Sequence, residues 1–231
     1  MTRRYLVVDD NLEFAENVAE ILTDAGAEVC VAAGGKSALE QLRATRFDGI
    51  VTDMKMPGLS GAELLRQMRA IDPGVPVVLL SAWAQDAQVA EARRLGLLAF
   101  LSKASGTPQL IELLSSARRD ATIVLIDDDR ALVENLSESL ASVGFTVCSA
   151  STIKELDGLS VQPLAALVDV RMPGSLDGAA ITRIEELFPG VPLLVVTAHH
   201  EFGGHETFHK PFDTAKLVAR LVAIAGQAER A

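Results

Sequence analysis

The 231-residue sequence has few cysteines, few prolines and no long apolar run. Its two cysteines, Cys30 and Cys148, each lie in an apolar, strand-like stretch, where we expect reduced and buried thiols. Nine prolines, 49% hydrophobic residues and no low-complexity segment argue against a disordered chain. No window reaches the roughly 20 apolar residues of a membrane span, and the first apolar run is too short for a signal peptide. We therefore expect a globular, cytoplasmic protein that does not enter a membrane.

Clustered basic charge is also scarce. The formal net charge is −10, and lysines and arginines come at most in pairs, at residues 3–4, 93–94 and 118–119. A protein that binds nucleic acid directly needs basic side chains that neutralise backbone phosphates. The sequence therefore predicts no direct nucleic-acid partner.

What the sequence does contain is an internal repeat. The stretch "YLVVDDNLEFAENVAEILTDAGAEVC" matches "IVLIDDDRALVENLSESLASVGFTVC", which aligns Asp9 with Asp127 at an offset of 118 residues. Further along, "DMKMPG" matches "DVRMPG" and "PGVPVVLLSA" matches "PGVPLLVVTA", both at an offset of 116 residues. We divide the chain into two domains, residues 1–120 and 121–231. No Gly-, Pro- or Ser-rich linker separates them, so we expect their relative orientation to be fairly fixed.

Short apolar runs alternate with longer helical patterns in each copy. In the first copy, five aliphatic runs are typical of parallel strands buried on both faces: residues 5–9, 28–33, 49–53, 75–82 and 98–103. Apolar residues spaced three and four apart predict helices over residues 12–26, 36–44, 62–71, 87–96 and 107–118. The predicted fold is α/β: two tandem flavodoxin-like (βα)5 domains, each with a doubly wound parallel sheet. The ligand site of such a domain lies at the carboxyl ends of the strands.

Reactive residues stand at these strand ends. In the first copy they are the pair Asp9–Asp10 after the first strand, Asp53 at the third, Ser81 at the fourth and Lys103 at the fifth. Converging carboxylates raise one another's pKa unless a cation is present, and Mg²⁺ prefers carboxylate oxygens together with water and phosphate oxygens. A hydroxyl and an ammonium group on the same rim suit the remaining oxygens of a phosphoryl group.

In these residues both copies resemble the receiver domain of two-component response regulators. The second copy repeats the set in the same order: Asp127, Asp128, Asp169 in "VDVRMPG", Thr197 before Ala198, and Lys210 in "HKPF". The resemblance covers nearly the whole chain twice. It implies that Asp53 and Asp169 accept phosphate from a histidine kinase or a phosphotransfer protein. It implies no enzyme activity beyond this self-phosphorylation and dephosphorylation.

The same resemblance implies a role for the other residues of each site. For Mg²⁺ it implies direct binding by Asp10 and Asp128 and by the two phosphoacceptors, water-mediated contact by Asp9 and Asp127, and the backbone carbonyl groups of Lys55 and Arg171. For the phosphoryl group it implies contacts from Ser81, Thr197, Lys103 and Lys210. It also matches Phe100 with the family's aromatic switch residue, which turns inward when the hydroxyl residue moves.

Other interpretations of these residues are weaker. A haloacid-dehalogenase-type phosphatase also has an aspartate nucleophile at a strand end, but it would want a second acid two residues later, where this chain has Lys55 and Arg171. Ser81 and Thr197 do not lie in the Gly-x-Ser-x-Gly motif of a hydrolase nucleophile. An isolated Asp-Asp pair or Pro-Gly turn is common in solvated loops, but five residue types in the right order in both copies disfavour coincidence.

The two copies differ around the lysine. Proline commonly follows it in this family, as Pro211 follows Lys210, whereas Ala104 follows Lys103, so we expect a differently shaped loop in the first copy. The second copy has Thr207 in place of the aromatic switch residue. The usual aromatic readout would therefore be absent from the second copy.

The second copy is also shorter between its fourth and fifth strands. Thr197 and Lys210 are 13 residues apart, whereas Ser81 and Lys103 are 22 residues apart. The remaining segment, which contains Gly203–Gly204, is too short and too glycine-rich for a helix of three turns. We predict that the fourth helix of the second domain is missing or truncated. Its loss would expose apolar surface to the other domain, to a second copy of the chain in a homodimer, or to a different downstream protein.

All four histidines fall in this segment, between His199 and His209. His205 and His209 have the spacing of two metal ligands on a helix, but His209 directly precedes Lys210 and should lie in a strand. We prefer a solvated loop for residues 199–209 over a transition-metal site or a pH sensor.

Three functions stay open from the sequence. The first, which we prefer, is a response regulator with two receivers and no output domain, in which phosphorylation changes a protein-interaction surface. The second is a phosphate relay or sink that drains phosphoryl groups from a kinase network. The third is a scaffold whose second receiver only binds a partner.

Overall fold

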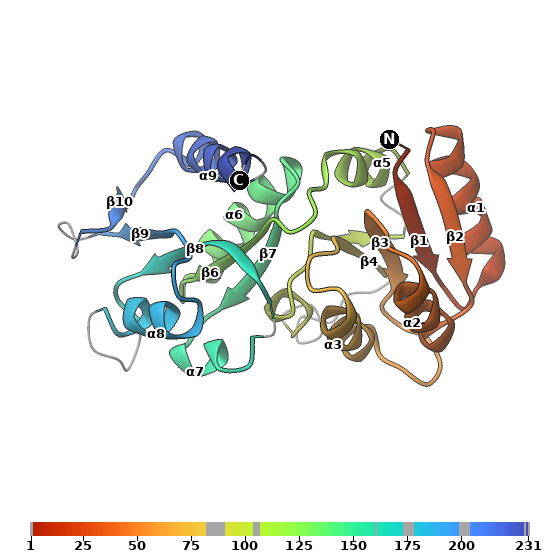
Figure 1. Cartoon of the computed structure of the whole chain (residues 1–231), viewed down its shortest axis with the longest axis horizontal. Helices are drawn as coiled ribbons and strands as arrows, with labels where there is room; N and C mark the ends of the chain where they lie inside the picture. Colours follow the sequence, from red (N-terminus) through yellow and green to blue (C-terminus); the bar gives the residue numbers. More distant parts are fainter. Residues whose placement is uncertain are drawn as a thin grey trace.

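The computed structural model of the protein describes residues 2–81, 91–103, 107–159, 161–172, 178–198, 204–228 and 230. These residues form two units, each built on a five-stranded parallel sheet (Figure 1). The strand order is β2-β1-β3-β4-β5 in the first unit and β7-β6-β8-β9-β10 in the second, which is the same order in both copies of the repeat. The predicted fold, two tandem flavodoxin-like domains with doubly wound sheets, is confirmed.

The first unit follows the predicted alternation of strands and helices. Its strands are β1 (Arg4–Val8), β2 (Glu28–Ala32), β3 (Gly49–Asp53), β4 (Val77–Ser81) and β5 (Ala99–Ser102). Its helices are α1 (Leu12–Asp24), α2 (Gly35–Ala44), α3 (Gly61–Ile71) and α5 (Thr107–Ser116). Residues 91–94 are also helical, as predicted, while the first part of that predicted helix lies outside the described residues. The loop of Ala104 lies outside them too.

The second unit repeats this order, and its second and fourth connections between strands are shorter. Its strands are β6 (Thr122–Ile126), β7 (Thr146–Ala150), β8 (Pro163–Asp169), β9 (Leu193–Thr197) and β10 (Glu206–His209). Its helices are α6 (Arg130–Ser142), α7 (Ile153–Leu156), α8 (Ala179–Leu187) and α9 (Thr214–Ala228). Residues 198–205 connect β9 to β10, and the described ones among them, 198, 204 and 205, are not helical. The centre of the segment predicted to have lost its helix, residues 199–203, lies outside the described residues.

Side-chain caps fix where α1 and α6 begin. Asn11 Oδ1 accepts a hydrogen bond of 3.1 Å from the N–H of Phe14, and Asp129 Oδ1 accepts one of 3.1 Å from the N–H of Leu132. Both caps follow directly on the acidic pairs. Each pair is therefore held between the end of a strand and the start of a helix.

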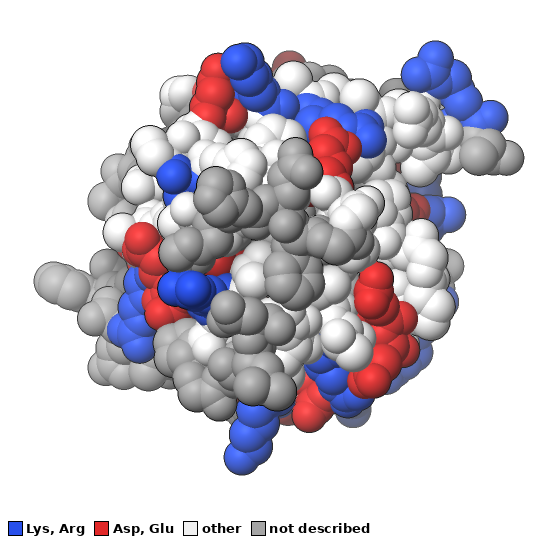
Figure 2. Space-filling model, turned by 90° about the vertical axis from the view of Figure 1, so that its left-hand side faces the viewer, with Lys and Arg blue, Asp and Glu red and all other residues white. Residues whose placement is uncertain are grey.

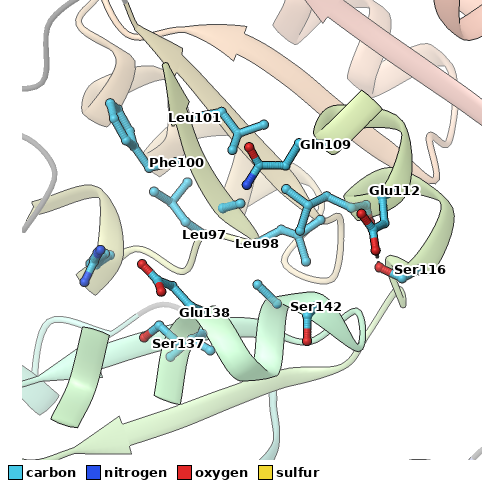
Figure 3. A pocket seen from close by; sticks show the side chains of 15 residues that line it. Leu97, Leu98, Phe100, Leu101, Gln109, Glu112, Ser116, Ser137, Glu138 and Ser142 are labelled. Atoms are coloured by element: carbon cyan, nitrogen blue, oxygen red, sulfur yellow. Dashed lines mark hydrogen bonds between the residues drawn. The ribbon is translucent and has the colours of Figure 1, made fainter. Parts of the chain in front are cut away.

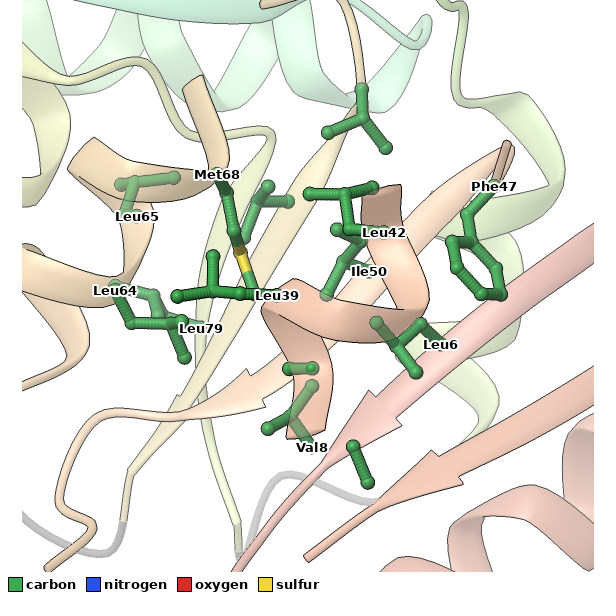
Figure 4. Packing of buried hydrophobic residues seen from close by; sticks show 14 of the residues in the cluster. Leu6, Val8, Leu39, Leu42, Phe47, Ile50, Leu64, Leu65, Met68 and Leu79 are labelled. Carbon is green, nitrogen blue, oxygen red and sulfur yellow. The ribbon is translucent and has the colours of Figure 1, made fainter. Parts of the chain in front are cut away.

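Hydrophobic residues fill both faces of the first sheet. On one face, Leu6, Val8 and Ile50 pack against α2 and α3 (Figure 4). On the other face, Tyr5 and Val7 belong to a second cluster that includes residues of α1 and α5. All residues of β3 and β4 are buried, as expected for central parallel strands. The only charged residue in these two strands stands at the end of β3.

The two units lie side by side, with β5 and α5 of the first facing α6 and β7 of the second (Figure 1). The connection from α5 to β6 contains the predicted domain boundary, and we propose to keep that boundary between Asp120 and Ala121. Within the described ranges, no helix has the length and apolar character needed to cross a membrane.

Candidate functional site

Three carboxylates meet at the carboxyl edge of the first sheet. β1 and β3 are neighbours, so their ends bring Asp9 and Asp10 next to Asp53. One carboxylate oxygen of each residue lies within 4.8 Å of the others. Asp9 and Asp53 are buried, with 1% and 8% of their surface exposed, whereas Asp10 is exposed. Buried carboxylates at such distances repel one another and need a cation nearby.

The ammonium group of Lys103 balances part of this charge. Its Nζ lies 2.6 Å from Asp9 Oδ2 and 2.8 Å from Asp53 Oδ2. Burial would lower the pKa of Lys103, but the hydrogen bonds and charges of Asp53 and Asp9 outweigh it, and the pKa is raised. The lysine is therefore held in its charged form.

Backbone N–H groups orient two of the carboxylates. The N–H of Lys55 donates to Asp53 Oδ1 at 3.1 Å, and the N–H of Asn11 donates to Asp9 Oδ1 at 2.9 Å. The second oxygen of each carboxylate contacts Lys103. Both side chains are thus held through both oxygens.

Ser81 completes this edge of the sheet. It ends β4, is 3% exposed, and pairs with Ser102 of the neighbouring strand β5. Its carbonyl oxygen accepts a hydrogen bond of 3.0 Å from the N–H of Lys103. The structure therefore places the predicted hydroxyl residue at the end of β4, next to the strand of Asp53, and the predicted ammonium residue after β5, one strand further out.

The second sheet builds the same cluster. Carboxylate oxygens of Asp127, Asp128 and Asp169 lie within 4.8 Å of one another. Lys210 Nζ lies 2.6 Å from Asp127 Oδ2 and 2.8 Å from Asp169 Oδ2, the same distances as in the first unit. The N–H of Arg171 donates to Asp169 Oδ1 at 3.1 Å, as Lys55 does in the first unit.

The buried charges of the second cluster shift its titration. Burial would lower the pKa of Lys210, but its hydrogen bonds and charge interactions with Asp127 and Asp169 outweigh it, and the pKa is raised. Burial raises the pKa of Asp127, an effect that Lys210 only partly offsets. Thr197 is 1% exposed, and its carbonyl oxygen accepts a hydrogen bond of 2.8 Å from the N–H of Lys210. The predicted hydroxyl residue of the second receiver therefore holds the position that Ser81 holds in the first.

Each cluster has the donors for a hard divalent cation. Mg²⁺ takes oxygen ligands, usually one or two carboxylates, and keeps several waters. Asp9, Asp53 and Asp127 are buried and Asp169 is half-buried, whereas Asp10 and Asp128 are exposed. That combination supplies ligands from the protein and leaves room for water and for a phosphorylated ligand.

A family model described as the response regulator receiver domain matches residues 5–115 and again residues 123–222. The chain belongs to this family. A response regulator receiver protein from Anaeromyxobacter sp. (strain Fw109-5) is 47% identical over 223 residues, which cover 95% of this chain and 94% of that protein. The resemblance seen in the sequence is confirmed, and the two units are the first and second receiver.

Single receivers match half of the chain. Chemotaxis protein CheY from Thermotoga maritima is 30% identical over 120 residues, which cover 52% of this chain and 100% of that protein. A solved structure of a CheY-like response regulator receiver domain protein from Methanospirillum hungatei JF-1 is 25% identical, with a TM-score of 0.49 over 50% of this chain and 92% of that one.

The predicted switch residue, Phe100, is half-buried in β5 of the first receiver. Its side chain packs against the cluster beneath α2 and α3, and it also lines a cavity between the receivers. In the second receiver the same position is Thr207, whose hydroxyl donates to the carbonyl oxygen of His205 at 3.1 Å. The aromatic side chain is therefore present at this position in the first receiver alone.

One contact of the site was not predicted from the sequence. The ring of Phe14 in α1 lies with its centroid 4.5 Å from Lys103 Nζ, a cation–π distance. The aligned residue of the second receiver is Leu132, which has no ring. The two lysines thus differ in one neighbour, which only a comparison of the two copies in three dimensions reveals.

The histidines lie apart from the carboxylates. His205 Nε2 is 3.5 Å from Glu185 Oε1, and His209 ends β10, in a strand as predicted. His199 and His200 lie outside the described residues. Among the described side chains, the groups that could hold a metal contain no histidine. The preference for a solvated loop stays a prediction.

Proposed function

We propose that the chain is a two-component response regulator that accepts phosphoryl groups on Asp53 and Asp169. The repeated cluster carries this proposal: in each receiver a lysine Nζ lies 2.8 Å from the proposed acceptor and 2.6 Å from the first residue of the acidic pair. The donor is a phosphohistidine of a histidine kinase or a phosphotransfer protein. The cytoplasmic location predicted from the sequence stays a prediction.

The chemistry is a transfer between two nucleophiles. An acceptor carboxylate oxygen forms a bond to phosphorus while the bond from phosphorus to the imidazole nitrogen of the donor breaks. In the first receiver the N–H of Lys55 holds Oδ1 of Asp53, so Oδ2 is the oxygen on the side of Lys103. The ammonium group exchanges a carboxylate for a phosphoryl oxygen and offsets the incoming charge. We assign the hydroxyl group of Ser81, or of Thr197 in the second receiver, to another phosphoryl oxygen.

The carboxylates would hold Mg²⁺. We assign it to Asp9, Asp10, Asp53 and the carbonyl of Lys55 in the first receiver, and to Asp127, Asp128, Asp169 and the carbonyl of Arg171 in the second. When bound, the ion supplies positive charge to the phosphoryl oxygens. The exposed Asp10 and Asp128 are accessible to a hydrated ion directly, whereas the buried Asp9 and Asp127 would act through water.

The matching distances favour phosphorylation of both receivers over a scaffold role for the second. A phosphate relay or sink is the second candidate, because it needs the same two sites. The two differ in where the phosphoryl group goes next. In the preferred function it stays on the chain and changes a protein-interaction surface.

The surface suits a protein partner. Figure 2 shows an end of the second receiver, where basic and acidic side chains are interspersed with large uncharged areas. In this receiver Arg220 pairs with Glu206, and Arg183 pairs with Asp157. Paired charges beside uncharged surface favour a downstream protein over direct binding of nucleic acid.

Intact-mass spectrometry after incubation with acetyl phosphate and Mg²⁺ tests the proposal. We expect two phosphates on the wild type and one on each of Asp53→Ala and Asp169→Ala. Zero phosphates on the wild type would overturn the proposed function. A single phosphate on the wild type that persists in Asp169→Ala and is lost in Asp53→Ala would show that the second receiver is a scaffold. Transfer of phosphate back to a phosphotransfer protein would indicate a relay.

A further inference from the structure

The edge strands of the two receivers are buried to different degrees. β2 and β7 hold the same place at the edge of their sheets, and their sequences align. Four of the five residues of β2 are exposed or half-buried, whereas all five residues of β7 are buried. The aligned cysteines follow this difference, since Cys30 is half-buried and Cys148 is buried. The additional cover on β7 comes from outside the repeat unit.

The first receiver supplies this cover through the segment between its helical residues 91–94 and β5. The N–H of Leu97 donates to the carbonyl oxygen of Val147 at 3.1 Å, and the N–H of Val147 donates back at 3.0 Å. The Sγ of Cys148 donates to the carbonyl oxygen of Arg94 at 2.7 Å. The two bonds between Leu97 and Val147 satisfy backbone groups that an edge strand otherwise leaves open.

The helices beside these strands also pack together. Ala141 of α6 is 4% exposed and belongs to the hydrophobic cluster of the first receiver, together with Leu110 and Leu113 of α5. The residue of α1 aligned with Ala141 is Thr23, which is exposed. One face of α6 is therefore adapted to α5.

Polar contacts hold the rim of this junction. The N–H of Arg118 donates to the carbonyl oxygen of Gly144 at 2.9 Å. Arg94 forms an ion pair of 2.8 Å with Glu155 across the two receivers. Apolar packing inside and paired charges outside are the arrangement of a specific protein interface.

A cavity of about 470 Å³ lies within this junction. Leu97, Leu98 and Leu101 of the first receiver line one side, and Ser137, Glu138 and Ser142 of α6 line the other (Figure 3). Phe100 also lines the cavity. Phe100 therefore contacts both the core of the first receiver and the cavity between the receivers.

One short strand, β5, connects the active site to this cavity. Lys103 contacts Asp53 and directly follows β5, whose residues Ala99, Phe100 and Leu101 line the cavity. A phosphoryl group on Asp53 that takes Lys103 as its partner would act on the end of β5. One edge of β5 pairs with β4, and residues of β5 line the cavity that the second receiver borders.

We propose that the second receiver is the built-in binding partner of the first, and that phosphorylation of Asp53 is transmitted to β7 and α6 through β5 and Phe100. The trigger rests on the proposed function, whereas the docking of the two receivers does not. Because β5 and α5 are covered within the chain, this face is closed to a second copy or another protein until the junction opens.

Two glycines test the docking with a matched control. Gly26 and Gly144 follow α1 and α6 and have φ of +91° and +93°, so alanine strains both alike. A Cβ at Gly144 would lie 2.0 Å from the carbonyl oxygen of Ser116 of the first receiver, whereas a Cβ at Gly26 would meet nothing within 4 Å. In the full chain we expect Gly144→Ala to speed hydrogen exchange at Val147 about tenfold and Gly26→Ala to leave it unchanged.

Equal exchange at Val147 in the two variants would overturn the docking. If Gly144→Ala fails to fold, Ala141→Glu with the control Thr23→Glu makes the same comparison. Protection of β7 that is lost when the wild type is diluted tenfold would show that a second copy is the occupant, and would also overturn the proposal.

Hydrogen exchange with acetyl phosphate and Mg²⁺ tests the transmission. We expect peptides of α6 and β7 to change exchange several-fold in the wild type and in Asp169→Ala, but not in Asp53→Asn. Intact mass on the same samples separates the two proposals. Phosphate on Asp53 without a change in these peptides would overturn the transmission alone. No phosphate on Asp53 would overturn both the proposed function and the transmission. The docking would then be decided by the comparison of the two glycine variants.

Discussion

Arg69 and Glu185 hold the same place in the two receivers, yet Arg69 is 2% exposed while the Glu185 side chain is 55% exposed. The guanidinium of Arg69 donates to the backbone carbonyl oxygens of Leu95 at 3.0 Å and Gly96 at 2.6 Å. These carbonyls directly precede Leu97, which bonds to β7. A buried arginine thus fixes the segment through which the receivers meet.

Replacing Arg69 should destabilise the first receiver. Arg69→Met removes the donors for four carbonyl oxygens, those of Leu95, Gly96, Pro73 and Val75. We expect the free energy of unfolding to fall by about 2–4 kcal/mol, because buried acceptors lose their partners. Urea unfolding followed by circular dichroism measures this, with Glu185→Met as the exposed control, expected within about 0.5 kcal/mol of the wild type. Equal losses in both variants would contradict the assigned role of Arg69.

Removing the lysine of the site should destabilise the unliganded protein. Lys103→Met leaves Asp9 and Asp53 buried without their cation, and we expect a loss of about 2–3 kcal/mol at pH 7. The loss should shrink below about pH 5, because protonation of one carboxyl relieves the repulsion. Thermal unfolding at several pH values checks this, with the exposed Lys55→Met as control. A loss that does not depend on pH would point to packing as its cause.

The two site lysines should make the protein sensitive to alkaline pH. The folded-state pKa values of Lys103 and Lys210 are raised above the ordinary value of 10.5. Their contribution to stability is therefore complete below that value and is lost as the pH rises through the folded-state pKa values. Between about pH 10 and 12, the unfolding temperature of the wild type should fall more steeply than that of a Lys103→Met/Lys210→Met variant. If the unfolding temperatures of the two proteins fall equally with pH, the lysine ion pairs do not determine the loss of stability between these pH values.

Mg²⁺ should stabilise both receivers by binding the folded state. At 100 times the dissociation constant, a single site adds about 2.7 kcal/mol. The unfolding temperature should rise with Mg²⁺ and return after chelation with EDTA. Asp10→Asn and Asp128→Asn should each remove the increase for one receiver, and the double variant should show no increase. A full response in the double variant would place the ion elsewhere.

The fold could be predicted from the sequence, and so could the residues that meet at the ends of the strands; their roles in phosphorylation stay predictions. Repeated aliphatic runs predict parallel strands because such runs are buried on both faces, and the strand ends then bring together residues as distant as Asp9 and Lys103. Those positions follow from topology alone. Local patterns therefore predicted the non-local cluster.

The contacts between the two receivers could not be predicted from the sequence. Ala141, Gly144 and Val147 look like ordinary helix, turn and strand residues, and only their aligned partners in the first receiver show that they are more buried than the repeat requires. The role of Arg69 was also missed, because an arginine in a helix usually lies in solvent and nothing local marks the carbonyls that it binds. Contacts between units depend on shape, which short-range patterns do not encode.

The bond between Leu97 and Val147 bears on aggregation. An edge strand with open N–H and C=O groups is a template on which a further chain can add, and natural proteins block such edges with bulges, charges or a covering segment. β7 has the neutral sequence "TVCSA", so its protection comes from the first receiver. A shortened chain that begins at residue 121 would carry this edge uncovered, and it should self-associate at concentrations where the full chain stays dispersed.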